Sequence, residues 1–329
     1  MNKLNIKRII FIITIIIFII INIIIYSNKY DILARYQYKD KDIQKQIKDN
    51  LNYEEINYII KYAIDPTTFI DIINNPYFNI YNINKYNDIT NKYWQLNKYD
   101  ACTIYELSII HNFNYELYID NTYHKVIIYY LEHKDKYINN SKLELNPNRL
   151  DLYLDNTNTI SILENTNLHK IPLDITNNKE LYIDNRVIDD LVLMCKAISK
   201  DLVTNNCANT QIIEAYKSYV TLEKEYNDAL NNNLDIKDYE IPGHSEHQLG
   251  LAINLKVKDV SINNFDKTIQ YKWFKNNAHK YGFIFTYTKD TSKDTNINPK
   301  LNHLRYIGKY NSKIIYDNNI TLKELNNGN

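Results

Sequence analysis

Glycine, proline and cysteine are scarce in this chain of 329 residues, which contains five, six and three of them, respectively. The cysteines are odd in number and lack the spacing of a metal-binding cluster, so they exclude a disulfide framework and leave open only a pairing of Cys195 with Cys207. An excess of one charge is also missing, because 39 acidic side chains balance 39 basic ones. No general field therefore attracts nucleic acid or an acidic membrane surface, and we expect no nucleic-acid partner.

The abundant residue types indicate a coding bias rather than a function. Asparagine, isoleucine, lysine and tyrosine are used heavily, with 31 tyrosines, which is typical of an AT-rich coding sequence. The length is sufficient for one large or two modest domains with a substantial hydrophobic core.

An apolar run near the N-terminus has a clear interpretation. Residues 9–25 are apolar apart from two polar side chains, and the basic residues Lys3, Lys7 and Arg8 precede them. The run is long enough to span a bilayer, and no small-residue cleavage pattern follows it. Residues 1–30 are therefore predicted to be an uncleaved signal anchor in the cell membrane, a single-pass helix that leaves the C-terminal domain outside the cytoplasm. A buried core helix is the alternative.

Residues 31–178 are predicted to form a helical region followed by a connector. Asn52 and Glu55 have the spacing of a capping box at the start of a helix. Asp65-Pro66 predicts a second helix start, and residues 103–111 again place apolar side chains at helical spacing. No catalytic pattern is present in this region.

The stretch of residues 242–255 has the pattern of a functional site. It holds two histidines in a loop with a glycine on either side, in a chain that has only five glycines. From Gly250 onward apolar residues alternate with polar or small ones, as in a half-buried strand that carries Ala252 and Asn254 on one face. We expect the loop to fold His247 back toward that face.

Several motifs occur in order around this stretch. Ser245, His247, Gly250 and Ala252 match the pattern Ser-x-His-x-x-Gly-x-Ala-x-Asp, residues 273–283 read Trp-x-x-x-Asn-Ala-x-x-Tyr-Gly-Phe, and residues 303–308 read His-x-Arg-Tyr-x-Gly. Together they resemble the VanY-like D-alanyl-D-alanine carboxypeptidases, which are zinc metallopeptidases. The resemblance implies an α+β fold, in which a small antiparallel sheet flanked by helices follows the helical region and the N-terminal transmembrane anchor. It places this domain at residues 179–312 and a C-terminal tail at 313–329.

The resemblance also implies a zinc site from which this chain departs. The metal ligands would be His247, Asn254 and His303, but the family has Asp where Asn254 stands. The catalytic base would lie at Lys300, where the family has Glu. A neutral amide is a weaker zinc ligand than a carboxylate, and a charged lysine cannot accept a proton. We therefore expect weakened or absent zinc binding and no functional base at Lys300.

Two further positions are implied to bind substrate. Lys217 stands where the family has an Arg that holds the carboxylate of the terminal D-alanine, and Ser245 is the other candidate. Lysine keeps the charge but lacks the planar two-point fork of arginine, so recognition should be less strict.

These positions predict a membrane-anchored, exported carboxypeptidase-like protein that acts on or binds peptidoglycan stem peptides ending in D-Ala-D-Ala, with impaired catalysis. One alternative is an active zinc D,D-carboxypeptidase with an unusual ligand set, for example with His244 in place of the lost ligand. Another is an exported interaction module, formed by the helical region, on an inactive peptidase scaffold.

Overall fold

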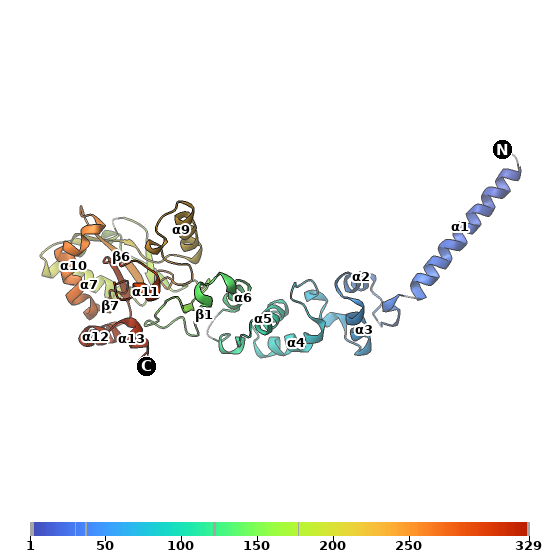
Figure 1. Cartoon of the computed structure of the whole chain (residues 1–329), viewed down its shortest axis with the longest axis horizontal. Coiled ribbons are helices and arrows are strands. Elements are labelled where there is room, and N and C mark those ends of the chain that lie inside the picture. The colour runs from blue at the N-terminus through green and yellow to red at the C-terminus, as the bar shows by residue number, and fades with distance from the viewer. Residues whose placement is uncertain (1–2, 30, 37, 121–122, 177, 328–329) are drawn as a thin grey trace. The chain divides into compact units, whose positions relative to one another are not determined.

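The computed structural model describes residues 3–29, 31–36, 38–120, 123–176 and 178–327 (Figure 1). The chain divides into two compact units, Met1–Phe113 and Asn114–Asn329, which we call the N-terminal and C-terminal units.

The first element of the N-terminal unit is the long helix α1, Lys3–Lys29. Its segment Ile6–Tyr26 has 21 residues and a mean hydropathy of 3.3, and none of its most apolar window is buried. An isolated helix that is apolar on all sides is not the core helix of a soluble domain. The segment is long and apolar enough to cross a membrane.

The rest of the N-terminal unit is helical, as predicted. The described helices after α1 are α2 (Lys41–Asn50), α3 (Tyr53–Lys61), α4 (Ile83–Lys92) and α5 (Lys98–Ile110). The capping box of Asn52 and Glu55 is present at the start of α3. The helix predicted after Asp65 is instead a pair of short 3-10 turns, because Phe69 leaves the helical conformation with φ −138°.

The C-terminal unit combines helices with small sheets. Its described helices are α6 (His124–Glu132), α7 (Ile188–Asp201), α8 (Asn206–Asn209), α9 (Tyr219–Asn231), α10 (Ile269–Asn277), α11 (Ser292–Thr295), α12 (Lys309–Asn318) and α13 (Leu322–Asn327). Its described strands are β1 (Lys142–Leu143), β2 (Asn158–Thr159), β3 (Leu168–Lys170), β4 (Tyr182–Asp184), β5 (Thr210–Glu214), β6 (Ala252–Val257), β7 (Phe283–Ile284) and β8 (His303–Tyr306). The α+β class with a small antiparallel sheet is confirmed.

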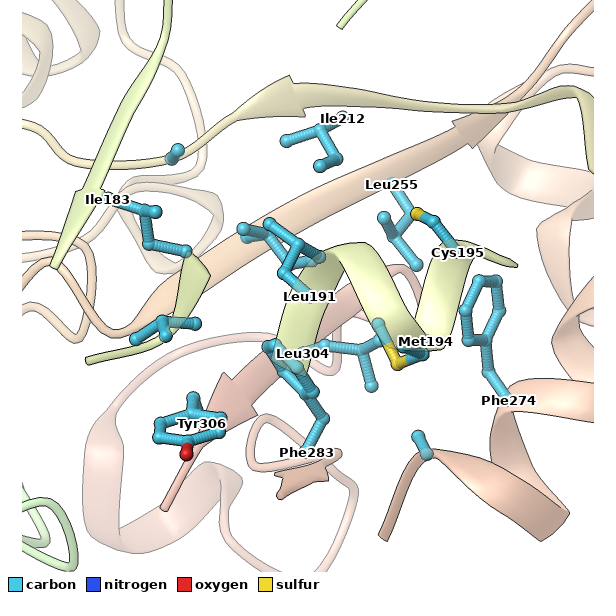
Figure 2. Packing of buried hydrophobic residues seen from close by; sticks show 14 of the residues in the cluster. Ile183, Leu191, Met194, Cys195, Ile212, Leu255, Phe274, Phe283, Leu304 and Tyr306 are labelled. Carbon is cyan, nitrogen blue, oxygen red and sulfur yellow. The ribbon is translucent and has the colours of Figure 1, made fainter. Parts of the chain in front are cut away.

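The largest sheet is antiparallel, with strand order β5-β6-β8-β7. One face packs on α7, whose side chains Leu191 and Met194 lie against Leu255 of β6 and Leu304 of β8 (Figure 2). Since successive side chains of a strand point to opposite faces, the residues between these core positions lie on the other face of the sheet.

Residues before the sheet also contribute to this core. Leu152, Leu154, Ile160 and Ile171 are buried in the same hydrophobic cluster as α7. The compact unit itself begins at Asn114, upstream of the predicted boundary. The functional limits of the domain at residues 179–312 stay a prediction.

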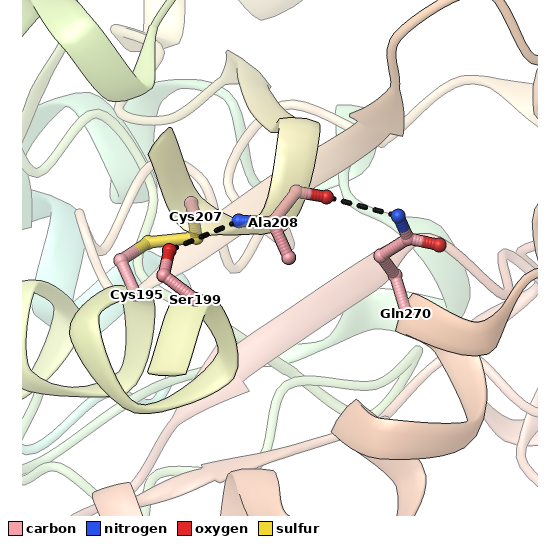
Figure 3. The surroundings of a disulfide bond; sticks show 5 residues. All are labelled: Cys195, Ser199, Cys207, Ala208 and Gln270. Carbon is pink, nitrogen blue, oxygen red and sulfur yellow. Dashed lines mark hydrogen bonds between the residues drawn. A yellow bond between two sulfur atoms is a disulfide. The ribbon is translucent and has the colours of Figure 1, made fainter. Parts of the chain in front are cut away.

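A disulfide joins Cys195 of α7 to Cys207, the pairing left open by the sequence (Figure 3). Cys207 and Ala208 both have left-handed backbone conformations, with φ 54° and 56°. Such residues cost about 1–2 kcal/mol each, so other contacts must hold the turn. The amide of Ala208 donates to Ser199 Oγ at 3.1 Å, and its carbonyl accepts from Gln270 Nε2 at 2.9 Å (Figure 3).

We expect replacement of both Cys195 and Cys207 by serine to destabilise the C-terminal unit by about 2–4 kcal/mol, the usual effect of losing a disulfide that closes a short loop. Urea denaturation of the full chain measures this change. Reductant should lower the stability of the natural protein and leave that of the double variant unchanged. Equal stability of the two proteins under oxidising conditions would show that the hydrogen bonds alone hold the turn.

Candidate metal site

The face of the sheet opposite α7 carries a row of polar side chains. In the antiparallel register, Asn254 of β6 lies directly opposite His303 of β8 on one side and Glu214 of β5 on the other. The amide nitrogen of Asn254 donates to Glu214, and Asn254 Oδ1 lies 2.8 Å from His303 Nδ1. Strand register therefore brings two of the predicted metal ligands together although 49 positions separate them.

The loop before β6 supplies the third predicted ligand, His247. Two glycines shape this loop: Gly243 and Gly250 have φ of +83° and +71°, and an added Cβ would lie 2.7 Å from Thr159 Oγ1 and 2.8 Å from Asn165 Nδ2, respectively. Gln248 braces the loop by accepting from the amide of Gly243 at 2.9 Å. Gly243 and Gly250 thus lie at positions whose positive φ and close neighbours disfavour any side chain.

His247 is fully buried and its ring meets a carboxylate that the motifs did not include. Its Nε2 lies 3.5 Å from Oε1 of Glu240, whose side chain is only 4% exposed. Neither ring nitrogen of His247 has a hydrogen-bond partner among the residues described here. The hydroxyl of Ser245 donates to the other oxygen of Glu240 and accepts from the amide of His247 at 3.1 Å.

His303 is held on its other side by Glu246. The carboxylate of Glu246 lies 2.9 Å from His303 Nε2 and accepts from the hydroxyl of Thr286 at 2.5 Å. Tyr287 packs on the imidazole with ring centroids 4.4 Å apart. A carboxylate behind a histidine is the usual way in which proteins orient a metal-binding imidazole.

The electrostatics favour an ionised Glu240 beside a neutral His247. Burial lowers the pKa of His247 to about 4, with Glu240 opposing the shift, so its ring is neutral at neutral pH. Burial would raise the pKa of Glu240, but attraction by the histidines when they are protonated and by Lys300, together with the hydrogen bond from Ser245, holds that pKa below its usual range. Neutral imidazole and ionised carboxylate are the forms that bind metals.

Lys300, which stands at the family's base position, pairs with Glu240. Its Nζ lies 3.5 Å from Glu240 Oε1 and 5.7 Å from the ring centroid of Tyr287. The structure thus brings Lys300, His247, Asn254 and His303 into one cluster, as the motifs predicted. Their roles in catalysis and metal binding stay predictions.

The two predicted substrate-binding residues are engaged with protein carboxylates. Lys217 Nζ lies 3.0 Å from Glu214 and 2.9 Å from Glu225. Burial alone would lower the pKa of Lys217, but the attraction of these two carboxylates outweighs it. The pKa of Lys217 is therefore raised above its usual value, and the amine stays charged. Ser245 is fully buried and bonded to Glu240. Their role in substrate binding stays a prediction.

His244 does not join the cluster. Its Nδ1 lies 2.8 Å from the carbonyl oxygen of Asp155, and its Nε2 lies 3.5 Å from Ser141 Oγ. Both nitrogens therefore have partners elsewhere, and the alternative three-histidine site has no support in the structure.

The arrangement fits a metal ion. Ligand atoms of Glu240, His247 and His303 all lie within 4.8 Å of one another, and all three residues are buried. Buried polar atoms without partners, such as those of His247, are exceptional unless something binds them. Sequence reasoning missed Glu240, which lies outside the family pattern. Its position just before the Pro242-Gly243 turn was the only available signal.

Comparison with known proteins shows a family likeness over the segment that holds the two histidines. A family model described as "VanY: D-alanyl-D-alanine carboxypeptidase" matches residues 180–309. The matched segment contains the buried histidine pair and the largest sheet, so the likeness concerns a domain of the carboxypeptidase type. Residues 180–309 of this chain are thus similar to the VanY family of D-alanyl-D-alanine carboxypeptidases.

Two curated relatives illustrate the likeness. YodJ of Bacillus subtilis (strain 168) is 36% identical over 118 residues, which cover 34% of this chain and 43% of YodJ. A D-alanyl-D-alanine carboxypeptidase of Enterococcus faecium is 35% identical over 88 residues, 26% of this chain and 28% of that enzyme. The chain thus spans less than half the length of either relative.

A solved structure shares the fold. The LdcB LD-carboxypeptidase, whose structure addresses the molecular basis of peptidoglycan recognition, is 27% identical, with a TM-score of 0.51. The match covers 57% of this chain and 90% of that one.

Proposed function

We propose that the C-terminal unit is an exported, zinc-binding, carboxypeptidase-like module that binds peptidoglycan stem peptides ending in D-Ala-D-Ala and hydrolyses them poorly. The observation that carries this proposal is the buried pair of His247 and His303 with acceptor oxygens around it, in a domain similar to the VanY family. His247, Asn254 and His303 are the residues expected from the family to hold the metal. Bound there, zinc would polarise a carbonyl group and acidify water.

Impaired hydrolysis follows from the side chain at the base position. Lys300 is paired with Glu240 and carries a charge, so it cannot take a proton from water. Glu246 and Glu214 are already engaged with His303 and Lys217, respectively. The alternative of an active enzyme would need a carboxylate free of these contacts.

Weak recognition of the substrate follows from the environment of Lys217. A terminal carboxylate would have to compete with Glu214 and Glu225, both within 3.0 Å of Lys217 Nζ. A cation that already has two anionic partners attracts a third less strongly. We therefore expect dissociation constants in the millimolar range, in contrast to a site with a free arginine fork.

The placement outside the cytoplasm is part of the same proposal. The basic residues Lys3, Lys7 and Arg8 precede the apolar segment of α1 and would stay on the cytoplasmic side. The disulfide of Cys195 and Cys207 supports this orientation, since disulfides persist mainly in oxidising compartments.

The test uses the full chain in detergent with zinc supplied. Titration with a stem peptide ending in D-Ala-D-Ala should show weak binding, and a matched peptide ending in L-Ala-L-Ala should show none. D-Alanine release should stay far below about 1 s⁻¹, the low end of ordinary enzyme turnover. Release at an ordinary rate would establish the active alternative, and equal behaviour of the two peptides would overturn stem-peptide recognition.

A further inference from the structure

The carboxylate of Glu240 lies in the histidine cluster although the sequence motifs did not include it. Its side chain is 4% exposed, and Oε1 lies 3.5 Å from both His247 Nε2 and Lys300 Nζ. Ser245 fixes the other oxygen by a hydrogen bond, which leaves Oε1 aimed at the histidine. A buried carboxylate is retained at a cost unless a cation or donors satisfy it.

A second observation concerns the lone pairs on His303 and Asn254. Glu246 accepts from His303 Nε2, so a neutral ring has its lone pair at Nδ1, 2.8 Å from Asn254 Oδ1. The amide cannot turn to offer its NH₂ group instead, because that group donates to Glu214. Two lone pairs this close repel each other unless a proton lies between His303 Nδ1 and Asn254 Oδ1 or both atoms bind the same cation.

The spacing of Glu240 and His247 matches that of metal ligands. Two ligand atoms about 2.1 Å from a tetrahedral ion lie roughly 3.4 Å apart. The distance between Glu240 Oε1 and His247 Nε2 is 3.5 Å, and neither nitrogen of His247 has a hydrogen-bond partner among the described residues. The separation is too long for a good hydrogen bond and suitable for a shared cation.

We propose that Glu240 is the anionic ligand of the metal site, which is then formed by Glu240, His247 and His303, with the amide oxygen of Asn254 beside them. This inference rests on the zinc binding proposed above and changes its ligand set. Asn254 lacks the negative charge of the Asp that the family has at this position. Glu240, which precedes His247 in the loop, supplies one negative charge to the same cluster.

With Glu240 as a metal ligand, we expect this chain to bind zinc and still to hydrolyse peptides poorly. A carboxylate that donates a lone pair to a metal loses much of its basicity, so Glu240 would be a poor proton acceptor for water. Within the described part of the chain, the other carboxylates of the cluster, Glu246 and Glu214, already have partners. Lys300 is the cationic partner of Glu240, with Nζ 3.5 Å from Oε1.

The test compares zinc affinity of the full-length natural protein, Glu240→Gln and Asp184→Asn by competition with a chelator. Asp184 is the matched control, because it is another buried carboxylate paired with a cation, Arg186, outside the cluster. We expect Glu240→Gln to weaken binding about a hundredfold, since even residues that only support a ligand contribute about 10–100-fold. Asp184→Asn should stay within about threefold of the natural protein.

Cobalt substitution gives a second readout that is independent of activity. The natural protein should show the intense visible absorption of four-coordinate cobalt, and Glu240→Gln should lose it. Zinc bound equally by the natural protein and Glu240→Gln would overturn this assignment and leave the proposed zinc site intact. An equal loss in Asp184→Asn would also overturn it, because the effect would then not be specific to Glu240. Absence of zinc from all three proteins would overturn the proposed zinc site itself.

Discussion

Replacement of His247 by alanine should abolish zinc binding by the full-length protein, with a loss of affinity of at least about a thousandfold. Changes behind a ligand typically cost about 10–100-fold, and removal of the ligand itself costs more. His247 is fully buried and its Nε2 faces Glu240, so alanine at this position leaves that side of the site without a nitrogen ligand. Zinc should also stop protecting the variant against heat. Saturating zinc at about 1,000 times its dissociation constant stabilises a binding protein by about 4 kcal/mol.

His244→Ala is the matched control for this change. His244 has the same side chain, lies in the same loop and is also buried, but its ring contacts Asp155 and Ser141. Both variants should lose stability through the cavities they create, and only His247→Ala should lose zinc. Zinc binding that survives in His247→Ala would contradict the proposed site, as would an equal loss in His244→Ala.

The second large effect is a gain of hydrolysis. The triple change Asn254→Asp, Lys300→Glu and Glu240→Ala returns the carboxylates to the family's positions and removes the extra one. General base catalysis contributes about 10²–10⁴-fold, so we expect D-alanine release to rise about a thousandfold over the natural protein. Release of D-alanine from a D-Ala-D-Ala peptide measures the gain.

The structure explains why Glu240 must be removed in this experiment. Lys300 lies 3.5 Å from Glu240, so Lys300→Glu alone would place two buried carboxylates side by side. One of them would then take up a proton, and the base would be lost. The matched control carries Lys300→Gln in place of Lys300→Glu and should bind zinc without the gain. A triple variant no faster than this control would contradict the view that a missing base limits the natural protein.

Local sequence pattern predicted the elements that carry the site. Alternating apolar residues predicted strand β6, and the ordered motifs placed Asn254 on the face that meets His303. The capping box of Asn52 and Glu55 likewise predicted a helix start, which is present in α3. These features depend on periodicity and capping, which neighbouring residues determine.

Glu240 could not be predicted in this way. The resemblance places the base three positions before His303, so the motifs direct attention to the segment around Lys300 and away from Glu240. Glu240 lies 60 positions before Lys300 and reaches it only because the loop folds back over the sheet. The contacts of Lys217 with Glu225 depend likewise on the packing of α9 near the end of β5.

The most direct test of this account is the zinc content of the purified full-length protein, measured together with X-ray absorption at the zinc edge. The account predicts about one zinc per chain, bound by two imidazole nitrogens and by oxygen atoms, as Glu240, His247 and His303 would supply. A protein that takes up no zinc at neutral pH, or that binds it without histidine nitrogens, would contradict the central claim.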